Sequence, residues 1–191
     1  MFFNILQLVA IVLLIGFGLV VPIGKYLVKT FTDEKDTIFE RYTYRFLGVN
    51  PAEQMTWQRY SQAILLSNLI LVLLFYIALR CQTALPLNPD KLSPSPSADL
   101  AFNTAISFVT NTDWQSYGGE TTLSYFNQMV MATSLMFTSS ATGLAAGVAV
   151  IRGLSQSGAN NLGNFWVDIT RSIYRLFLPI CLVLSLSLIH I

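Results

Sequence analysis

The feature that most constrains this chain is a set of apolar runs about as long as a membrane is thick. Residues 2–23, 63–79 and 125–151 carry no charged side chain. An α-helix rises ~1.5 Å per residue, so roughly twenty residues cross the ~30 Å hydrocarbon core of a bilayer. The composition agrees, because 11% charged residues is well below the roughly 25% of soluble domains. We therefore predict an all-α integral membrane protein.

The lysine and arginine residues predict the orientation of these spans. Segments 24–62 and 152–175 hold nine of the eleven basic residues, and segment 80–124 holds the other two. Cytoplasmic loops are enriched in Lys and Arg, so the first two segments are expected inside and the N-terminus outside. No basic residue precedes the first apolar run, which favours a retained helix, ended by Pro22, over a cleaved signal peptide. A net charge of +1 without a basic cluster argues against a nucleic-acid partner.

The remaining segments give further expectations. Residues 37–47 have helical apolar spacing and are expected to form an amphipathic helix at the membrane surface, broken by Asn50-Pro51. The other expected boundaries are Thr56-Trp57 and Arg80 for the second span, Arg152 for the end of the third, and Phe165–Asp168 for the start of the last.

Gly143 and Gly147 have a GxxxG spacing that we expect to pack within the chain. Asp168 and Arg171 are spaced to pair on a helix. Cys81, Cys181 and His190 are isolated, which gives no indication of metal or redox chemistry.

One polar stretch stands apart from this pattern. Residues 98–109 predict a helix too short to cross a bilayer, entered through Ser93–Ser97, with Ser97 as N-cap and Asp99 in the first turn. The polar run 110–115 and the return 116–120 follow it. Irregular backbone survives at membrane depth only where protein surrounds it or where it lines a wet cavity. Short helix, polar strand and return together predict a pore loop.

A pore loop of this kind can bind a cation. The C-terminal end of the short helix carries partial negative charge, and the carbonyl oxygens of Thr110, Asn111, Thr112 and Asp113 can replace part of an ion's hydration shell. Spacing alone leaves a second interpretation equally open, in which the stretch is a polar connector lying in water.

A resemblance distinguishes the two interpretations. The segment Asn103–Phe126 resembles the first pore segment of the bacterial potassium-transporting ATPase A subunit, the KdpA family. Leu85–Pro89, Ala141–Gly143, Ile151–Gly153 and Leu162–Arg171 resemble further pieces of the same family in the same order. The long pore-segment match is much more specific than a short regular motif.

The resemblance implies a fold of the potassium channel-like transporter superfamily, with four helix–pore loop–helix repeats after one extra N-terminal helix. This chain would then hold the extra helix (1–23), a cytoplasmic amphipathic connector (24–62), the first repeat (63–151, with pore helix 98–109 and filter 110–115), a cytoplasmic loop (152–171) and the opening helix of a second repeat (172–191). Since the last residues, 185–191, stop inside a predicted span and one repeat supplies about a quarter of an ion's shell, we expect residues 1–191 alone not to transport potassium.

The resemblance also implies a function. The family's A subunit takes potassium from the periplasm and passes it to a P-type ATPase B subunit in the inner membrane, with C and F subunits in the complex. The B subunit hydrolyses ATP, so this chain is expected neither to bind nucleotide nor to be an enzyme. The implied potassium ligands are Thr110, Asn111, Thr112 and Asp113, and the residues beside them are Trp114, Gln115, Gly118 and Gly119.

One departure concerns the filter itself. The family usually reads Thr-Asn-Thr-Asn-Trp-Gln, whereas this chain has Asp113 at the second Asn. We hypothesise that the carboxylate strengthens cation binding and loosens selectivity; the alternative is a carboxylate held away from the ion by local donors. Two other function classes stay open, a Trk- or Ktr-type potassium transporter and a non-transport membrane scaffold. A membrane enzyme is least favoured, because no clustered His, Cys or paired carboxylates occur.

Overall fold

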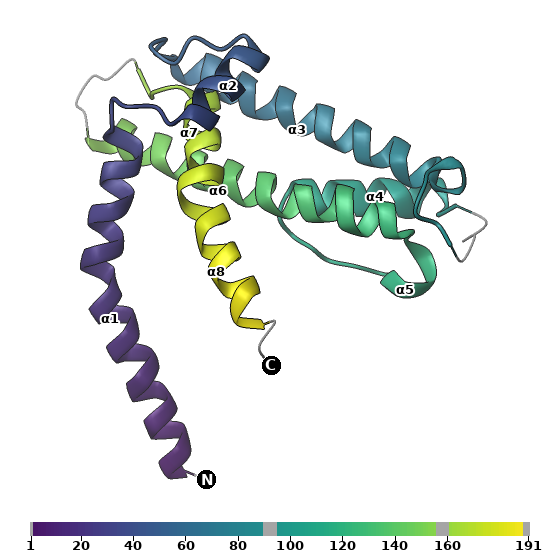
Figure 1. The fold of residues 1–191 in the computed structure, drawn as a ribbon, viewed down its shortest axis with the longest axis horizontal. Coiled ribbons are helices and arrows are strands. Elements are labelled where there is room, and N and C mark those ends of the chain that lie inside the picture. The colour runs from purple at the N-terminus through teal and green to yellow at the C-terminus, as the bar shows by residue number, and fades with distance from the viewer. Residues whose placement is uncertain (1, 90–94, 156–160, 189–191) are drawn as a thin grey trace. The chain divides into compact units, whose positions relative to one another are not determined.

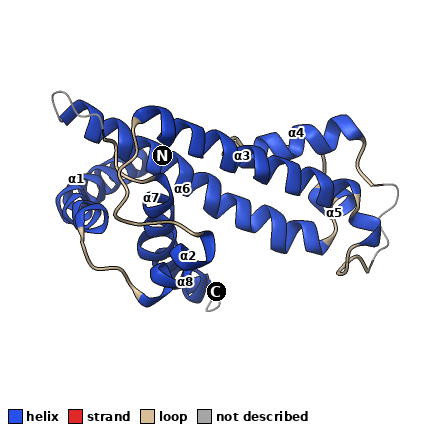
Figure 2. Ribbon diagram, turned by 90° about the horizontal axis from the view of Figure 1, so that it is seen from above, coloured by secondary structure: helices blue, strands red, loops and turns tan. Residues whose placement is uncertain are grey.

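The computed structural model describes residues 2–89, 95–155 and 161–188, and these form helices without a strand (Figure 2). His190, Lys91, Ser93 and Pro94 lie outside the described residues. The helices are α1 (Phe2–Thr32), α2 (Ile38–Leu47), α3 (Trp57–Arg80), α4 (Ala98–Val109), α5 (Gly119–Thr122), α6 (Thr133–Ser155), α7 (Phe165–Arg171) and α8 (Leu178–Leu188), with a 3-10 turn η1 (Gln82–Ala84) and π-helical turns η2 (Asn127–Ala132) and η3 (Ser172–Phe177).

Four helical stretches of the described chain are long and apolar enough to cross a membrane. They are Ile5–Thr32, Trp57–Arg80, Asn127–Ser155 and Phe165–Leu188. The last two each run through a π-helical turn, η2 or η3, without a break in the helix. The chain divides into two compact units, residues 1–38 and residues 39–191.

Helix α1 makes up most of the first unit, and it corrects one expectation. Pro22 lies inside the helix, which continues to Thr32. A proline in a helix interior costs about 3 kcal/mol or more. Ending the helix in an apolar medium would leave several backbone groups unbonded, each at a cost of several kcal/mol. Continuation past Pro22 is therefore the less costly arrangement.

Helix α2 ends three residues before the predicted break at Asn50-Pro51. Gly48 follows the helix with φ of 65°, a conformation that glycine adopts without steric cost. Its N–H donates to the Arg45 carbonyl at 3.4 Å, and the Val49 N–H donates to the Tyr44 carbonyl at 2.9 Å. These two bonds form a Schellman motif, which satisfies the last carbonyls of α2.

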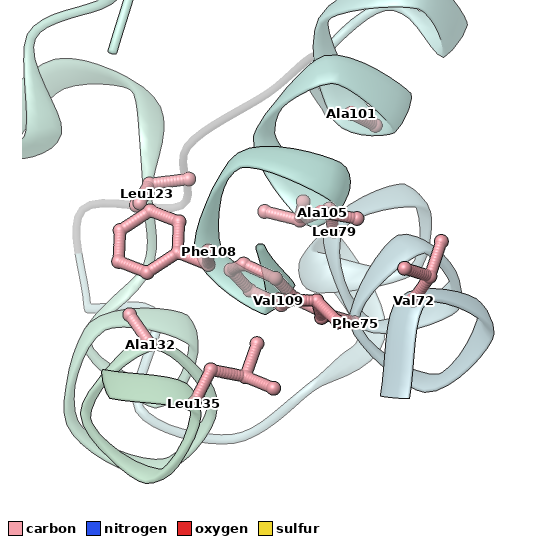
Figure 3. Packing of buried hydrophobic residues seen from close by; sticks show 10 residues of the cluster. All are labelled: Val72, Phe75, Leu79, Ala101, Ala105, Phe108, Val109, Leu123, Ala132 and Leu135. Atoms are coloured by element: carbon pink, nitrogen blue, oxygen red, sulfur yellow. The ribbon is translucent and has the colours of Figure 1, made fainter. Parts of the chain in front are cut away.

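In the second unit, α4 packs against both α3 and α6 (Figure 1). The buried core between them contains Val72, Phe75, Leu79, Ala101, Ala105, Phe108, Val109, Leu123, Ala132 and Leu135 (Figure 3). The rings of Phe75 and Phe108 meet edge to face with centroids 5.6 Å apart, a favoured aromatic geometry. The C-terminal end of α4 is therefore fixed in a solid apolar core.

The packing face of α6 differs from the one expected. Ala141, Ala145 and Ala149 are buried, whereas a Cβ placed on Gly143 or Gly147 would meet no atom of the described chain within 4 Å. The expected packing of the two glycines within the chain is wrong for the described residues, because alanines that lie two residues away along the helix form the contact. The helix also continues past Arg152 to Ser155.

The last helical stretch begins at Phe165, as the sequence predicts, and so starts within the predicted cytoplasmic loop 152–171. Helix α7 starts at Phe165, and the Asn164 side chain accepts a hydrogen bond from the Trp166 N–H at 3.0 Å. Asparagine is a favoured N-cap because its side-chain oxygen satisfies a free N–H of the first turn. The predicted loop therefore consists of helix at both of its ends.

Candidate functional site

The short helix α4 has the expected position, but its N-terminus is capped differently. Ser97 occupies the N-cap position without a side-chain cap bond. The Asp99 carboxylate instead accepts hydrogen bonds from the Ser97 hydroxyl and from the backbone N–H groups of Asp99 and Leu100, and these bonds hold the pKa of Asp99 below its ordinary value. A carboxylate in the first turn also complements the helix dipole.

The polar segment after α4 does not form the predicted strand, because residues 110 and 111 are a turn and residues 112–115 are irregular backbone. We keep the name strand for residues 110–113, which are bonded back to the helix through their N–H groups. All four N–H groups of residues 110–113 donate to carbonyl oxygens of the last turns of α4. The bonds are Thr110 to Ile106 (2.9 Å), Asn111 to Phe108 (3.3 Å), and Thr112 and Asp113 to Ser107 (3.0 and 3.3 Å). The N–H and C=O of a trans peptide point in opposite directions. The carbonyls of the same peptide planes, those of residues 109–112, therefore point away from the helix.

The backbone dihedrals of this strand alternate in sign. Thr110 has φ of −86°, whereas Asn111 and Asp113 are left-handed with φ of 57° and 51°. Asn and Asp are the non-glycine residues that most often adopt this region. Alternation of right- and left-handed residues keeps successive N–H groups on one side of the chain. The Thr-Asn-Thr-Asp alternation is the sequence signal that indicates these left-handed residues, in place of the predicted polar strand.

Side-chain hydroxyl groups fix the strand to both neighbouring helices. The Asn111 Oδ1 atom accepts hydrogen bonds from Ser139 and Ser140 of α6, both at 3.2 Å. The Ser107 hydroxyl donates to the Trp114 carbonyl at 3.0 Å. The Thr110 hydroxyl donates to the Ile106 carbonyl at 2.8 Å. The sequence does not indicate the two serines as partners of Asn111, because they lie 28 and 29 residues away.

The polar side chains of the strand are open to the surroundings. Thr110, Asn111 and Thr112 are exposed, as are Trp114 and Gln115, and Asp113 is half-buried. The Asp113 Oδ1 atom is buried, and no donor in the described parts of the chain reaches it. The role of the Asp113 carboxylate therefore stays a prediction, with one of its oxygens lacking a donor among the described residues.

The glycines beside the strand belong to the return. Gly118 precedes α5 and Gly119 begins it. Gly119 and Gln115 line a pocket of about 220 Å³, and the Gln128 side chain donates to the Gly119 carbonyl at 3.1 Å. The return is thus attached to η2. We call residues 97–128 the pore-loop end of the second unit.

Charged side chains gather at the opposite end of α3 and α6. Arg152 binds Asp168 with two hydrogen bonds, of 2.6 and 3.0 Å, and the Tyr60 hydroxyl donates to Asp168 at 3.0 Å. The prediction named Arg171 as the partner of Asp168, but the principal partner is Arg152, which lies sixteen residues upstream. Arg175 binds the fully buried Glu40 with bonds of 2.6 and 2.7 Å. We call these two pairs the ion-pair end.

The described residues contain no cluster of three or more His, Cys, Asp or Glu side chains suited to a metal ion. The oxygen atoms available to a cation are instead the backbone carbonyls and the polar side chains of the pore-loop end. Such ligands suit an alkali ion that is bound and then released.

Two membrane-length helices that flank a short helix and an irregular polar loop define a membrane protein with a helix–pore loop–helix unit. The family model of the potassium-transporting ATPase A subunit matches residues 9–191. The chain belongs to this family, which confirms the predicted family and the all-α membrane fold class.

Curated relatives agree with this assignment. The potassium-transporting ATPase potassium-binding subunit of Delftia acidovorans is 50% identical over 177 residues, which cover 93% of this chain and 31% of the relative. The subunit of the same name from Alicyclobacillus acidocaldarius is 48% identical over 174 residues, which cover 88% of this chain and 31% of the relative. The chain thus spans about a third of the length of these relatives.

Proposed function

We propose that this chain forms part of the potassium-binding, channel-like subunit of an ATP-driven potassium uptake complex. The strand 110–113 supplies one wall of its selectivity filter, and other pore segments supply the rest. Family membership and the names of the relatives support this proposal. A P-type ATPase B subunit, with C and F subunits, receives the ion and hydrolyses ATP, so this chain binds potassium but no nucleotide.

We also propose that the pore loop enters the inner membrane from the outer face, with the N-terminus outside. The distribution of basic residues supports this orientation, because segments 24–62 and 152–175 hold nine of eleven. The filter then meets external potassium before the ion moves toward the ATPase.

The observation that carries the proposal is the direction of the peptide planes after α4. The N–H groups of residues 110–113 are all bonded to the helix, which leaves the carbonyls of residues 109–112 directed away from it. Carbonyl oxygens aligned on one side of a strand can replace water around a potassium ion. The negative end of the α4 dipole adds attraction for a cation. Asp113 contributes its carboxylate in addition.

Substitutions of Asn111 test this proposal. Asn111→Gly keeps the left-handed backbone but removes the amide held by α6, whereas Asn111→Val disfavours the backbone itself. Strain at such a φ costs of order 1–3 kcal/mol, so we expect Asn111→Val to raise the apparent KM for potassium roughly tenfold or more. Asn111→Gly should have a smaller effect. The measurement is potassium uptake by the complex that contains this sequence.

Thr121→Val in α5 is the matched control, since its hydroxyl donates to the Gly118 carbonyl of the return. It should leave the apparent KM unchanged. An Asn111→Val complex that assembles normally and keeps its potassium KM would show that the strand does not coordinate the ion.

A further inference from the structure

Helix α2 is amphipathic, but it turns its polar face toward the protein and its aromatic face outward. Its face toward the protein holds the carboxylate of Glu40 and the ring of Tyr44, which are 0% and 3% exposed. Its outer face holds Tyr42 and Phe46, which are 67% and 89% exposed and lie one helical turn apart. A surface helix of a soluble protein has the reverse arrangement, with its apolar side toward the core.

Buried polar contacts fix this orientation. Arg175 of η3 donates from Nε and Nη2 to the two oxygens of Glu40, at 2.6 and 2.7 Å. The Thr43 and Tyr174 hydroxyl groups lie 3.2 Å apart, and the rings of Phe39 and Tyr174 are stacked. A bidentate pair between an arginine and a carboxylate restricts geometry as well as distance. The rings of Tyr42 and Phe46 are therefore held outward.

The partner of Glu40 also defines the level at which α2 lies. Arg175 is the last charged residue of the span Phe165–Leu188, and residues 176–188 carry no charge. The transition from charged to wholly apolar sequence marks the edge of the hydrocarbon core. Trp57, at the start of the span Trp57–Arg80, is 62% exposed, and aromatic residues are enriched at this edge. Helix α2 is thus attached at the boundary between the charged and the wholly apolar part of this span.

Two arginines flank the aromatic face. Arg41 and Arg45 are exposed and lie one turn apart, beside Tyr42 and Phe46 on the helix surface. Aromatic rings between the headgroups and basic side chains at the phosphates are the composition of an interfacial helix. Positive charge at this level attracts anionic lipid.

We propose that α2 is an interfacial anchor, whose Tyr42–Phe46 face enters the lipid headgroup region and whose Arg41 and Arg45 bind anionic phospholipid. The ligand is the lipid surface itself. The anchor keeps the contact between α2 and η3 at a constant depth in the membrane while ions move past the pore loop. It does not depend on the proposed coordination of potassium.

A spin label at position 46 tests the proposal. Phe46→Cys is made in a Cys81→Ser/Cys181→Ser background, and the complex that contains this sequence is reconstituted in vesicles of phosphatidylcholine and phosphatidylglycerol. We expect the label to be accessible to O2 and protected from the polar reagent NiEDDA. A label at Gln54→Cys, an exposed position in the loop after α2, is the matched control and should be accessible to NiEDDA.

Two outcomes at position 46 would overturn the anchor. Accessibility to NiEDDA would place the face in water, and protection from both reagents would show that protein covers it. Arg41→Gln/Arg45→Gln tests the lipid charge separately. This double substitution should reduce the depth of the label in vesicles with phosphatidylglycerol and leave it unchanged in pure phosphatidylcholine. An equal change in both membranes would overturn the binding of anionic phospholipid.

Discussion

The two ends of the helix bundle in the second unit treat polar groups in opposite ways. At the ion-pair end, each carboxylate is buried and receives two hydrogen bonds from an arginine, as Glu40 does from Arg175 and Asp168 from Arg152. At the pore-loop end, N–H groups are bonded to α4, while the Asp113 Oδ1 atom has no donor in the described chain.

The difference separates a structural role from a binding role. Charge that is fully compensated within the protein has no capacity left for a ligand, and breaking such a pair is costly. Oxygen atoms left without donors attract whatever cation can reach them. Charged residues are therefore the conspicuous feature of the ion-pair end, but the pore-loop end is the one suited to potassium.

The largest expected effect comes from breaking the ion-pair end. Arg152→Met leaves the carboxylate of Asp168, whose side chain is 2% exposed, without its principal cation. Removing one partner of a buried pair typically costs about 3–5 kcal/mol, so we expect a loss of that order in the free energy of unfolding. Denaturant unfolding of the purified complex in detergent measures it.

Two further variants test whether this loss comes from the unpaired carboxylate. Arg152→Met/Asp168→Asn should recover much of the loss, because a neutral side chain costs less to bury. Gly163→Ala should mimic Arg152→Met, since a Cβ there would overlap the Arg152 guanidinium and Gly163 has φ of 94°. An Arg152→Met complex as stable as the parent would mean that water already screens the pair, and the comparison between the two ends would fail.

The helices were more predictable from the sequence than their contacts. The bounds of α4 follow from a short apolar run between Asp99 and a polar strand, and α3 begins where Thr56 caps it, with the Arg59 N–H 3.5 Å from its hydroxyl. Local signals of this kind act within one helical turn. The end of α1 at Thr32 was missed because the surrounding apolar sequence outweighs the helix-breaking tendency of Pro22.

The residues of the candidate site stay a prediction, whereas the contacts that hold them were not predictable from the sequence. Asn111 was identified from its segment, whereas its donors Ser139 and Ser140 lie 28 and 29 residues away. Glu40 and Arg175 are 135 residues apart. Pairs at such separations depend on how helices pack, and no local pattern in the sequence specifies them.

A smaller effect is expected from removing the carboxylate at the pore-loop end. Asp113→Asn replaces a charge beside the proposed ion path with a neutral amide. A charge ~4 Å away is worth about 4 kcal/mol at most near a protein surface, and water at the open strand reduces this. We expect the apparent KM for potassium to rise about tenfold and the uptake of rubidium relative to potassium to change. Isotope uptake by the complex measures both.

Glu120→Gln is the matched control, because it removes the same charge from an exposed position in α5. It should leave both quantities unchanged. Unaltered potassium and rubidium kinetics in Asp113→Asn would show that the carboxylate takes no part in ion binding, although the carbonyl oxygens of the strand would remain candidates.

The smallest expected effect concerns the hydroxyl groups that hold Asn111. A neutral hydrogen bond contributes about 0.5–1.5 kcal/mol, so Ser139→Ala and Ser140→Ala should each raise the apparent KM for potassium by roughly twofold to tenfold. Ser139 is 4% exposed and Ser140 is half-buried. Water can replace the second hydroxyl more easily than the first, so we expect the larger effect for Ser139→Ala.

A double-mutant cycle shows whether the serines act through Asn111. Ser139→Ala in an Asn111→Gly background should add little, because the amide that the hydroxyl supports is already absent. Thr138→Ala is the control, since its hydroxyl donates to backbone carbonyls of the same helix. Additive effects of Ser139→Ala and Asn111→Gly would mean that the serine affects uptake independently of the strand. The pore-loop end would then depend on α6 for packing, and the position of the carbonyls would be set by α4 alone.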